Sequence, residues 1–561
     1  MCGIAGYIYK NTETFVPKEK IQKMLKAIEH RGPDGYGIYT KGNVSFGMQR
    51  LAIIDKMEHT IPYFTYDGKM GIVYNGEVYN HNQIKRNLVI KDKLNYQSDA
   101  ETVLYSIYEK GIRSSCCEFN GMFAFAVFEP TQNKMTIVRD KSGEKPLYYY
   151  EDNEKFLFAS EIKAILAIVK PEYNYDILSY KAFEICCGKE TLFKNIYTVE
   201  PGAYIEFVDG KIKEKTYWKV WDHQIEIPDN EYKIVRELTD LLEDAILLRT
   251  RNSVHEIGCL VSGGVDSALV ACIAKPDYIY TGHYDINKSF DELYYAKLVA
   301  NQINKELRII RPTKEDYVKY QNTIIYYLDQ PATWTSFNLF MVFKKASEEV
   351  KVIMSGEGAD ELFGGYHRYH LLNHDQKIFD LPALNEYHFL INKYYGSLES
   401  RYARLINRNP NQFDERNTQY IENIVKFYFC KVDGIINGMG LTDFFTSMQI
   451  LLTMADRMSM FFHIENRSPF LDHRLIQYAF SLNDKYKIKN GITKYILKKV
   501  AQRIIPKEIV QRIDKRGFAA PVNIWFDWAK NGQYDRHGYR DSIFEIWKSI
   551  YFEKWPILEK S

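Results

Sequence analysis

The chain of 561 residues is too long for one ordinary domain, so two to four domains are expected. Lysine and arginine (74) nearly balance aspartate and glutamate (72), and a formal net charge of +2 provides no basic surface for nucleic acid. A hydrophobic fraction of 46% with 26% charged residues is ordinary globular composition, which excludes disorder for most of the chain.

Cysteine usage and hydropathy favour a reducing compartment. None of the eight cysteines shows C-x-x-C spacing, so neither a disulfide framework nor a zinc site is indicated. No apolar run approaches the roughly 18 to 20 residues of a membrane helix, and the first thirty residues lack the apolar core of a secretory signal. We therefore expect a cytoplasmic protein without a membrane partner.

The first 205 residues or so consist of short apolar segments separated by Gly, Asn and Asp, a pattern typical of strands. Apolar residues recur at helical spacing only at 16–30 and 99–111. The pattern predicts sheets covered by a few helices, that is, an α+β half.

The pattern of apolar residues changes after 222–231, a polar stretch whose composition suits a linker. Residues 231–251 have helical periodicity, and from about residue 366 the pattern is mainly helical. Between them, helical segments separate strand candidates at 257–261, 278–282, 306–310 and 351–355. Strands that alternate with helices predict a parallel α/β sheet.

Cys2 is the first candidate functional residue. Removal of Met1 would leave a thiol and an α-amine on one residue. The α-amine, with a reference pKa of about 7.7 to 8.0, suits a base near neutral pH, and the thiol is a strong nucleophile. By itself a cysteine at position 2 is usually incidental, and Asn75-Gly76 is also the commonest hairpin signal.

Eight short sequence blocks decide between these interpretations, because they occur along the chain in the same order as in one known protein family. The first half resembles the N-terminal-nucleophile glutaminase domain of class II glutamine amidotransferases through CGIAG at 2–6, HRGPD at 30–34, RLAIID at 50–55, YNGEVYN at 74–80, SDAE at 98–101, GMFAFAVF at 121–128, RDKSGEKPLYY at 139–149 and FASEIKAIL at 158–166. The resemblance implies an αββα sandwich over residues 1–220.

The same resemblance assigns roles in glutamine hydrolysis. Cys2 would attack the side-chain amide, with the Asn75 side chain and the Gly76 N–H as the oxyanion hole. Met48 stands where the family usually has histidine, which puts the affinity for glutamine in question. The other implied contacts are Arg50 on the α-carboxylate, Asp99 and Glu77 on the α-amine, and the backbone of Ile53 and Ile54 along the pocket.

SGGVDS at 262–267 lies between an apolar strand and an apolar helix. The N–H groups of such a turn and of the helix N-terminus face one point, which favours a phosphate. The spacing excludes an ordinary P-loop. Asp266 fits if Mg²⁺ bridges carboxylate and phosphate oxygens. The alternative is a simple helix cap by Ser262 or Ser267.

A second glycine-rich turn, in KVIMSGEGADELFGGY at 351–366, repeats this design with Glu357, Asp360 and Glu361 close together. Ligands of an open α/β sheet gather at the carboxyl ends of its strands. Both turns are therefore expected to face one crevice.

These turns resemble the ATP-pyrophosphatase domain of asparagine synthetases, as do FDELYYAK at 290–297, DQP at 329–331, ADRMSMFFHIENRSPFLDHRL at 455–475, TKYILKK at 493–499 and IPKEIVQRIDKRGFAAP at 505–521. The resemblance implies Mg²⁺ on Asp266 and Asp360. Lys494, with Lys515 as a second candidate, would stabilise the departing pyrophosphate, and Glu357 would take a proton from attacking ammonia. The implied nucleotide contacts are Leu260, Ser262, Gly263, Gly264, Asp266, Ser267, Thr281, Ser355 and Gly356.

Together the resemblances imply a member of the glutamine-hydrolysing asparagine synthetase family, with a glutaminase domain at 1–220, a linker at 221–230 and a synthetase domain at 231–561. ATP, aspartate and glutamine would give AMP, pyrophosphate, asparagine and glutamate through an acyl-AMP intermediate, with ammonia passing through the protein. Members of the family often form dimers, so the resemblance leaves a homodimer as one alternative for the oligomeric state.

Two alternatives remain. The same chemistry could act on another carboxylate, such as a sugar uronate in polysaccharide biosynthesis, since ELRIIRP and TWTSF depart from the family pattern. A non-catalytic regulator on the same fold would require lost site residues, whereas the predicted ones are present.

Overall fold

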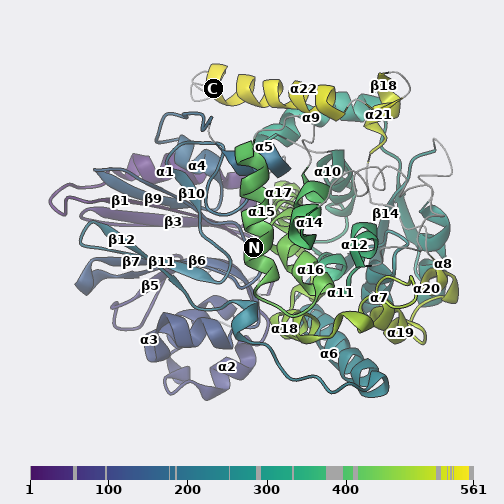
Figure 1. Ribbon diagram of the computed structural model, residues 1–561. Helices are drawn as coiled ribbons and strands as arrows, with labels where there is room; N and C mark the ends of the chain where they lie inside the picture. The colour runs from purple at the N-terminus through teal and green to yellow at the C-terminus, as the bar shows by residue number, and fades with distance from the viewer. Residues whose placement is uncertain are drawn as a thin grey trace.

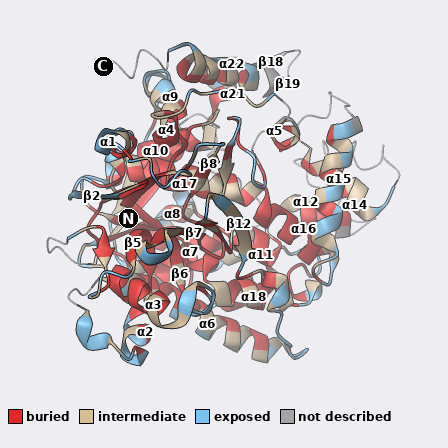
Figure 2. Cartoon of the chain, turned by 90° about the vertical axis from the view of Figure 1, so that its left-hand side faces the viewer, coloured by how far each residue is buried: buried red, intermediate tan, exposed pale blue. Residues whose placement is uncertain are grey.

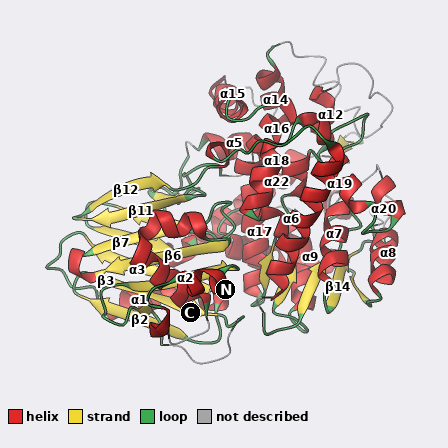
Figure 3. Cartoon of the chain, turned by 90° about the horizontal axis from the view of Figure 1, so that it is seen from below, coloured by secondary structure: helices red, strands yellow, loops and turns green. Residues whose placement is uncertain are grey.

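The computed structural model describes residues 2–54, 60–94, 98–175, 177–183, 186–251, 253–285, 292–331, 334–373, 396–407, 415–512, 520–526, 529–530, 533–534 and 536–554. Two halves lie side by side, one built mainly of strands and one mainly of helices, and the N-terminal end of the chain lies at their boundary (Figures 1 and 3). None of the described helices is both long enough and apolar enough to cross a membrane.

The first half contains two antiparallel sheets. One has the order β10-β8-β9-β1-β3-β2, from β1 (Cys2–Tyr9), β2 (Tyr36–Lys41), β3 (Val44–Arg50), β8 (Tyr148–Glu151), β9 (Lys155–Ala159) and β10 (Ile196–Thr198). The other has the order β12-β11-β7-β6-β5-β4, from β4 (Tyr63–Phe64), β5 (Gly71–Val78), β6 (Gly121–Glu129), β7 (Lys134–Arg139), β11 (Ala203–Val208) and β12 (Lys211–Thr216).

Helices cover the outer faces of the two sheets. Helices α1 (Lys18–Lys26) and α4 (Ile162–Leu166) pack against the first sheet, and α2 (His81–Asn87) and α3 (Asp99–Glu118) lie beside the second. Strand β1 is buried on both faces: Ala5 and Tyr7 pack with the helices, whereas Cys2, Ile4 and Ile8 belong to the core between the sheets. The predicted αββα sandwich is therefore confirmed, and Cys2 faces its interior.

The second half is organised by a parallel sheet with the order β15-β14-β13-β16-β17. The strand candidates correspond to β13 (Ile257–Leu260), β14 (Tyr278–Gly282), β15 (Leu307–Ile310) and β16 (Val352–Met354), while β17 (Glu465–Arg467) was not predicted. Strand order reverses between β13 and β16, so their carboxyl ends flank the switch point at which ligands of such sheets bind.

Helices surround this sheet. The elements are α6 (Glu231–Arg251), α7 (Val265–Ala274), α8 (Leu293–Ile303), α9 (Lys314–Leu328), α10 (Trp334–Ala346), α11 (Ala359–Phe363), α12 (His367–Asn373), α14 (Leu398–Ile406), α15 (Glu415–Phe429), α16 (Ile435–Phe445), α17 (Ser447–Phe461), α18 (His473–Ser481), α19 (Tyr495–Ala501), α20 (Lys507–Gln511), α21 (Val522–Trp525) and α22 (Arg536–Lys548), with α5 (Leu178–Phe183) and the hairpin β18 (Ala529–Lys530) and β19 (Gln533–Tyr534). Helices α10, α16 and α17 are largely buried, whereas α6 exposes one face (Figure 2).

Candidate active sites

The first site forms where the two sheets of the sandwich face each other. Cys2 pairs with Arg50 across β1 and β3, and its side chain faces the second sheet. The backbone nitrogen of Cys2 donates a hydrogen bond to Asn75 Oδ1 on β5 over 2.9 Å. Asn75 Nδ2 is buried and has no hydrogen-bond partner among the described residues. An amide donor without a partner beside a nucleophile is what an oxyanion hole requires.

Gly76 is fixed by close strand pairing. Asn75-Gly76 lies inside β5 and not in a hairpin turn, with Gly76 opposite Phe123 of β6. A Cβ atom at Gly76 would lie 2.3 Å from the carbonyl oxygen of Met122. Only glycine therefore fits beside the predicted oxyanion donor.

Two buried carboxylates lie at the position predicted for the α-amine of glutamine. Burial raises the pKa of Glu77, and the nearby charge of Asp99 raises it further. Burial also raises the pKa of Asp99, whose Oδ2 accepts hydrogen bonds from Tyr74 Oη (2.5 Å) and Val78 N (2.9 Å). A positive charge placed beside this pair would favour its ionised form and so oppose the effect of burial.

Tyr63 of β4 joins this site without having been predicted. Burial raises the pKa of its hydroxyl, and the charges that act on it include those of Cys2, Arg50 and Asp99. The segment that carries Tyr63 contains none of the motifs, so no pattern in the sequence pointed to this residue. The carbonyl of Ile53 accepts from Val254 N of the second half over 3.1 Å, and Ile54 beside it is half-buried.

Arg31 is a second residue that the prediction missed, although it lies in the HRGPD block. Its Nε donates to the carbonyl of Cys2 over 3.1 Å. Its other nitrogens bind Asp456 of α17 (2.8 and 3.2 Å) and Glu161 (2.8 Å). The guanidinium is fully buried, so Arg31 holds the nucleophile's backbone against the second half.

The second site forms at the switch point of the parallel sheet. The turns after β13 and β16 contact each other, because a Cβ atom at Gly356 would lie 2.9 Å from Asp266 Cβ. Gly263 has a φ of 67°, the left-handed region that favours glycine. The Ser267 hydroxyl accepts from Ser262 N over 3.1 Å and so closes the first turn. The two glycine-rich turns thus lie together at the carboxyl ends of the adjacent strands β13 and β16.

Lys494 links the two predicted metal ligands. Its Nζ lies 2.6 Å from Asp266 Oδ2 and 2.5 Å from Asp360 Oδ1. The backbone of Lys494 has a φ of 53°, an uncommon conformation for a residue with a side chain. Glu361, although adjacent in sequence, turns away and accepts from Tyr366 Oη over 2.7 Å. Two carboxylates from different turns therefore share one cation.

Glu357, the predicted base, is held by three donors. Its Oε2 accepts from Ser355 Oγ (2.7 Å), Ser468 Oγ (2.9 Å) and Asn466 Nδ2 (3.0 Å). Asn466 and Ser468 were not predicted. They lie in the NRSPFLD portion of a block that carried the resemblance, so the signal was present but assigned no role.

The remaining nucleotide-contact predictions fall at the same edge of the sheet. Leu260 ends β13, and Thr281 lies near the end of β14 with its buried hydroxyl unpartnered among the described residues. Behind the first turn, Arg512 donates to the Gly263 carbonyl over 3.2 Å and forms two hydrogen bonds with Glu292. Lys515 lies outside the described residues.

The residues present fit a magnesium ion that also binds phosphate. Among the described residues, no group of three or more His, Cys, Asp or Glu side chains could hold a metal by itself. Mg²⁺ commonly takes only one or two carboxylates together with substrate phosphates and water. Asp266 and Asp360 supply two carboxylates, and the ammonium of Lys494 shows that a cation is accommodated between them.

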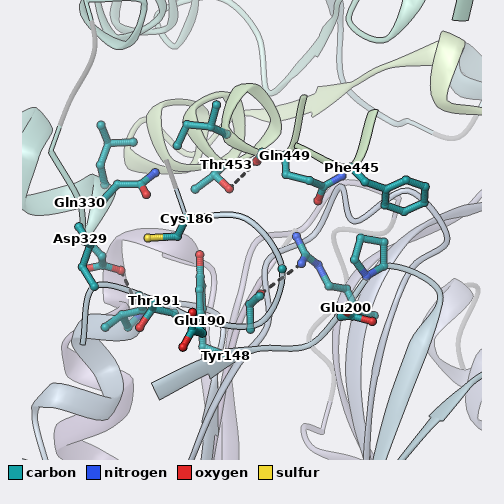
Figure 4. Close-up of a pocket in the computed structure, with 18 of the residues that line it drawn as sticks. Tyr148, Cys186, Glu190, Thr191, Glu200, Asp329, Gln330, Phe445, Gln449 and Thr453 are labelled. Atoms are coloured by element: carbon teal, nitrogen blue, oxygen red, sulfur yellow. Dashed lines mark hydrogen bonds between the residues drawn. The ribbon is translucent and has the colours of Figure 1, made fainter. Parts of the chain in front are cut away.

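A cavity of about 120 Å³ between the halves is separate from both sites. Figure 4 shows Glu190 and Thr191 of the first half opposite Gln449 and Thr453 of α17. The guanidinium of Arg139 in its wall already donates to the carbonyls of Gly143, Lys145 and Val199. None of the residues that line the cavity belongs to the predicted sites.

An Ntn-type sandwich with its cysteine on the first strand, joined to a parallel sheet with two glycine-rich turns, defines an ATP-dependent ligase that hydrolyses glutamine. Two family models match the chain: a glutamine amidotransferase domain over residues 1–218 and asparagine synthase over residues 237–552. The chain belongs to the glutamine-hydrolysing asparagine synthetase family.

Three relatives illustrate the range of similarity. Asparagine synthetase [glutamine-hydrolyzing] 1 of Bacillus subtilis is 30% identical over 97% of this chain and 92% of its own length. A putative asparagine synthetase of Methanocaldococcus jannaschii is 33% identical over 65% of this chain and 76% of its own. The amidase chyE of Penicillium rubens is 24% identical over 94% of this chain and 89% of its own.

Proposed function

We propose that the protein is a glutamine-dependent asparagine synthetase that amidates aspartate through an acyl-AMP intermediate. The observation that carries the ATP-dependent chemistry is the Lys494 ammonium held between Asp266 and Asp360 beside the Gly263 turn, and aspartate as the acceptor is supported by the asparagine synthetase relative that covers nearly the whole chain. A site of this kind suits a magnesium nucleotide whose leaving group is anionic, since the cation is already in place.

In the glutaminase site, the α-amine of Cys2, freed by removal of Met1, acts as the base for its own thiol. The thiolate attacks the glutamine amide carbon, and Asn75 Nδ2 donates to the oxygen that becomes negative. Glu77 and Asp99 bind the α-amine, and Arg50 binds the α-carboxylate. Ammonia leaves, and water later releases glutamate from the sulfur.

In the synthetase site, a carboxylate oxygen of the acceptor attacks the α-phosphorus of ATP and pyrophosphate leaves. Mg²⁺, when bound by Asp266 and Asp360, neutralises phosphate charge. Lys494, which the metal would displace from the two carboxylates, then donates to the departing pyrophosphate. Ammonia attacks the acyl carbon, Glu357 takes a proton from it, and AMP leaves.

Another carboxylate acceptor is the second candidate. It is supported by the amidase relative, which has a different name at 24% identity yet aligns with nearly the whole chain. The three donors on Glu357 and the carboxylate pair serve any acyl-AMP equally well, so they favour neither acceptor.

The test measures pyrophosphate release with MgATP, aspartate or a panel of other acids including sugar uronates, and either glutamine or ammonium. Aspartate should be required for release, and Cys2→Ala should abolish the response to glutamine while ammonium still supports release. Release with another acid and none with aspartate would replace the acceptor. No release with any acid, and no glutamate formed, would favour the non-catalytic alternative.

A further inference from the structure

Strand β17 stands between the two active sites. It is the edge strand of the parallel sheet, pairs with β16, and lies against the glutaminase half. Its three residues, Glu465–Arg467, are all polar and all buried. Because side chains of a strand alternate in direction, neighbouring residues of β17 can serve different sites.

One face of β17 contacts the glutamine site. Arg467 Nη2 lies 3.9 Å from Glu77 Oε2, and Arg467 Nε donates to Glu465 Oε1 over 2.6 Å. The guanidinium carbon lies 5.4 Å from the centre of the Tyr79 ring. Glu77 Oε1 has no hydrogen-bond partner among the described residues, so this carboxylate keeps one oxygen for a ligand.

The other face of β17 contacts the synthetase site. Asn466 Nδ2 and Ser468 Oγ both donate to Glu357 Oε2. The carbonyl of Arg467 itself accepts from Ser355 N over 3.0 Å. Ser355 begins the second glycine-rich turn. Arg467 thus contacts the glutamine site with its side chain and the nucleotide turn with its backbone.

We propose that Arg467 is a positioning residue that couples occupancy of the glutamine site to the geometry of Glu357 and the Ser355 turn. This inference rests on the proposed function, because it takes Glu77 as the group that binds the α-amine of glutamine. An ammonium at Glu77 Oε1 competes with Arg467, which lies 3.9 Å from Oε2, for the negative charge that the two oxygens share.

The tight packing around Arg467 is the reason that such competition affects the second site. Its side chain is fully buried, so the guanidinium has little free space in which to adjust alone. A change in its pairing with Glu77 is therefore passed to the backbone of β17. The carbonyl of Arg467 accepts the hydrogen bond from Ser355 N. The next residue, Ser468, donates its hydroxyl to Glu357, so a shift of the β17 backbone moves both contacts.

Coupling between two sites is a ratio of affinities and is reciprocal. The experiment uses the full chain as Cys2→Ala, which cannot hydrolyse glutamine, with Mg²⁺ and α,β-methylene-ATP as the nucleotide probe. Calorimetry gives the Kd of glutamine with and without the nucleotide. We expect a ratio of about fivefold or more in Cys2→Ala. Adding Arg467→Lys should reduce the ratio below about twofold, while the Kd of each ligand alone changes less than about threefold.

Arg474→Lys is the matched control. Arg474 pairs with Asp472 at the edge of the same interface, and within the described part of the chain its ion pairs go to Asp472 and Asp244 and not to Glu77 or β17, so the ratio should be unchanged. If Arg467→Lys does not fold, the neutral pair Glu465→Gln/Arg467→Met removes both charges together, and the same loss of coupling is expected.

The outcomes separate the two proposals. No binding of glutamine, or none of the nucleotide, to Cys2→Ala contradicts the proposed function. Binding of both ligands with a ratio near one overturns the coupling alone. A ratio that survives Arg467→Lys also overturns it, as does a parallel loss of both affinities, because that loss would indicate a merely structural role.

Discussion

The two sites prepare for their ligands in opposite ways. In the glutaminase site Cys2 and Asn75 lie on long, buried strands, and Asn75 Nδ2 has no partner within the part of the chain that the structure describes. In the synthetase site the charged groups lie at the beginnings of helices, and they already pair with one another, as Lys494 does with Asp266 and Asp360.

The difference follows from the charge of what each site receives. The side-chain amide of glutamine is neutral, so an amide donor that waits for it without a partner lowers stability only modestly. The hydrogen bond from this donor becomes stronger as negative charge develops on the amide oxygen. A magnesium nucleotide brings several charges, and buried carboxylates without a cation would be costly while the site waits. The glutaminase site is therefore preorganised, and the synthetase site must exchange partners.

Lys494→Met tests this comparison with the largest expected effect. A cation that stabilises phosphoryl transfer is worth about 10³- to 10⁵-fold, so ammonium-dependent pyrophosphate release should fall by about 10³-fold or more. Glutamate formation without ATP should stay within about twofold, which also reports that the fold is intact. Lys499→Met, on the exposed side of α19, is the control. A loss below tenfold would refute the role of Lys494.

Asn75→Ala probes the preorganised site. Removal of one oxyanion donor should lower kcat for glutamine hydrolysis by about 10²- to 10³-fold with a smaller change in KM, because the donor acts in the transition state. Ammonium-dependent release should be unchanged. Asn80→Ala, at the half-buried residue that precedes α2, serves as the comparison variant, since the Asn80 side chain binds Glu118 and Asn120 and not Cys2. A rise in KM at constant kcat would show that Asn75 only binds the substrate.

The sequence predicts most of the fold, since the periodic segments become the observed strands and helices. It also predicts the residues that the family blocks share, because each block is a continuous stretch of sequence that can be recognised without knowledge of the tertiary structure. Both sheets and both glycine-rich turns are therefore found where the patterns placed them.

The contacts that the sequence did not predict are those that depend on tertiary structure. Strand β17 has no apolar residue, so no strand pattern exists at 465–467. Its buried charges pair with each other, Arg467 with Glu465, and Arg467 also lies 3.9 Å from the distant Glu77. Arg31 and Asp456 are 425 positions apart, and no local spacing reveals their pairing. Arg457 of α17 likewise pairs with the distant Glu161 of the first half over 2.8 Å.

Lys487 offers a contrast with Lys494 within the same half. It is fully buried, and its Nζ has no hydrogen-bond partner among the described residues. The Phe480 ring lies 5.0 Å away, and Asp484 is the charge that favours its protonated form. Burial lowers the pKa of Lys487 to about 7. Lys494 is paired with carboxylates and can exchange these partners for a ligand. Lys487 has no such partner among the described residues, so its buried charge lowers the stability of the fold.

Lys487→Met is thus expected to stabilise the protein in a pH-dependent way. In the unfolded chain the lysine has a pKa of about 10.4. Below pH 7 the lysine is charged in both states, so folding buries the charge; above about pH 10.4 it is neutral in both states, and folding carries no such cost. Wild-type stability gains from this residue as pH rises from 7 to 10.4. The apparent Tm of Lys487→Met should exceed that of the wild type by about 2 to 4 °C at pH 6, and the difference should shrink by pH 9. Lys485→Met, two residues away on the surface, should show no such trend. A difference independent of pH would mean that the methionine merely packs better, and that the buried charge has no part in it.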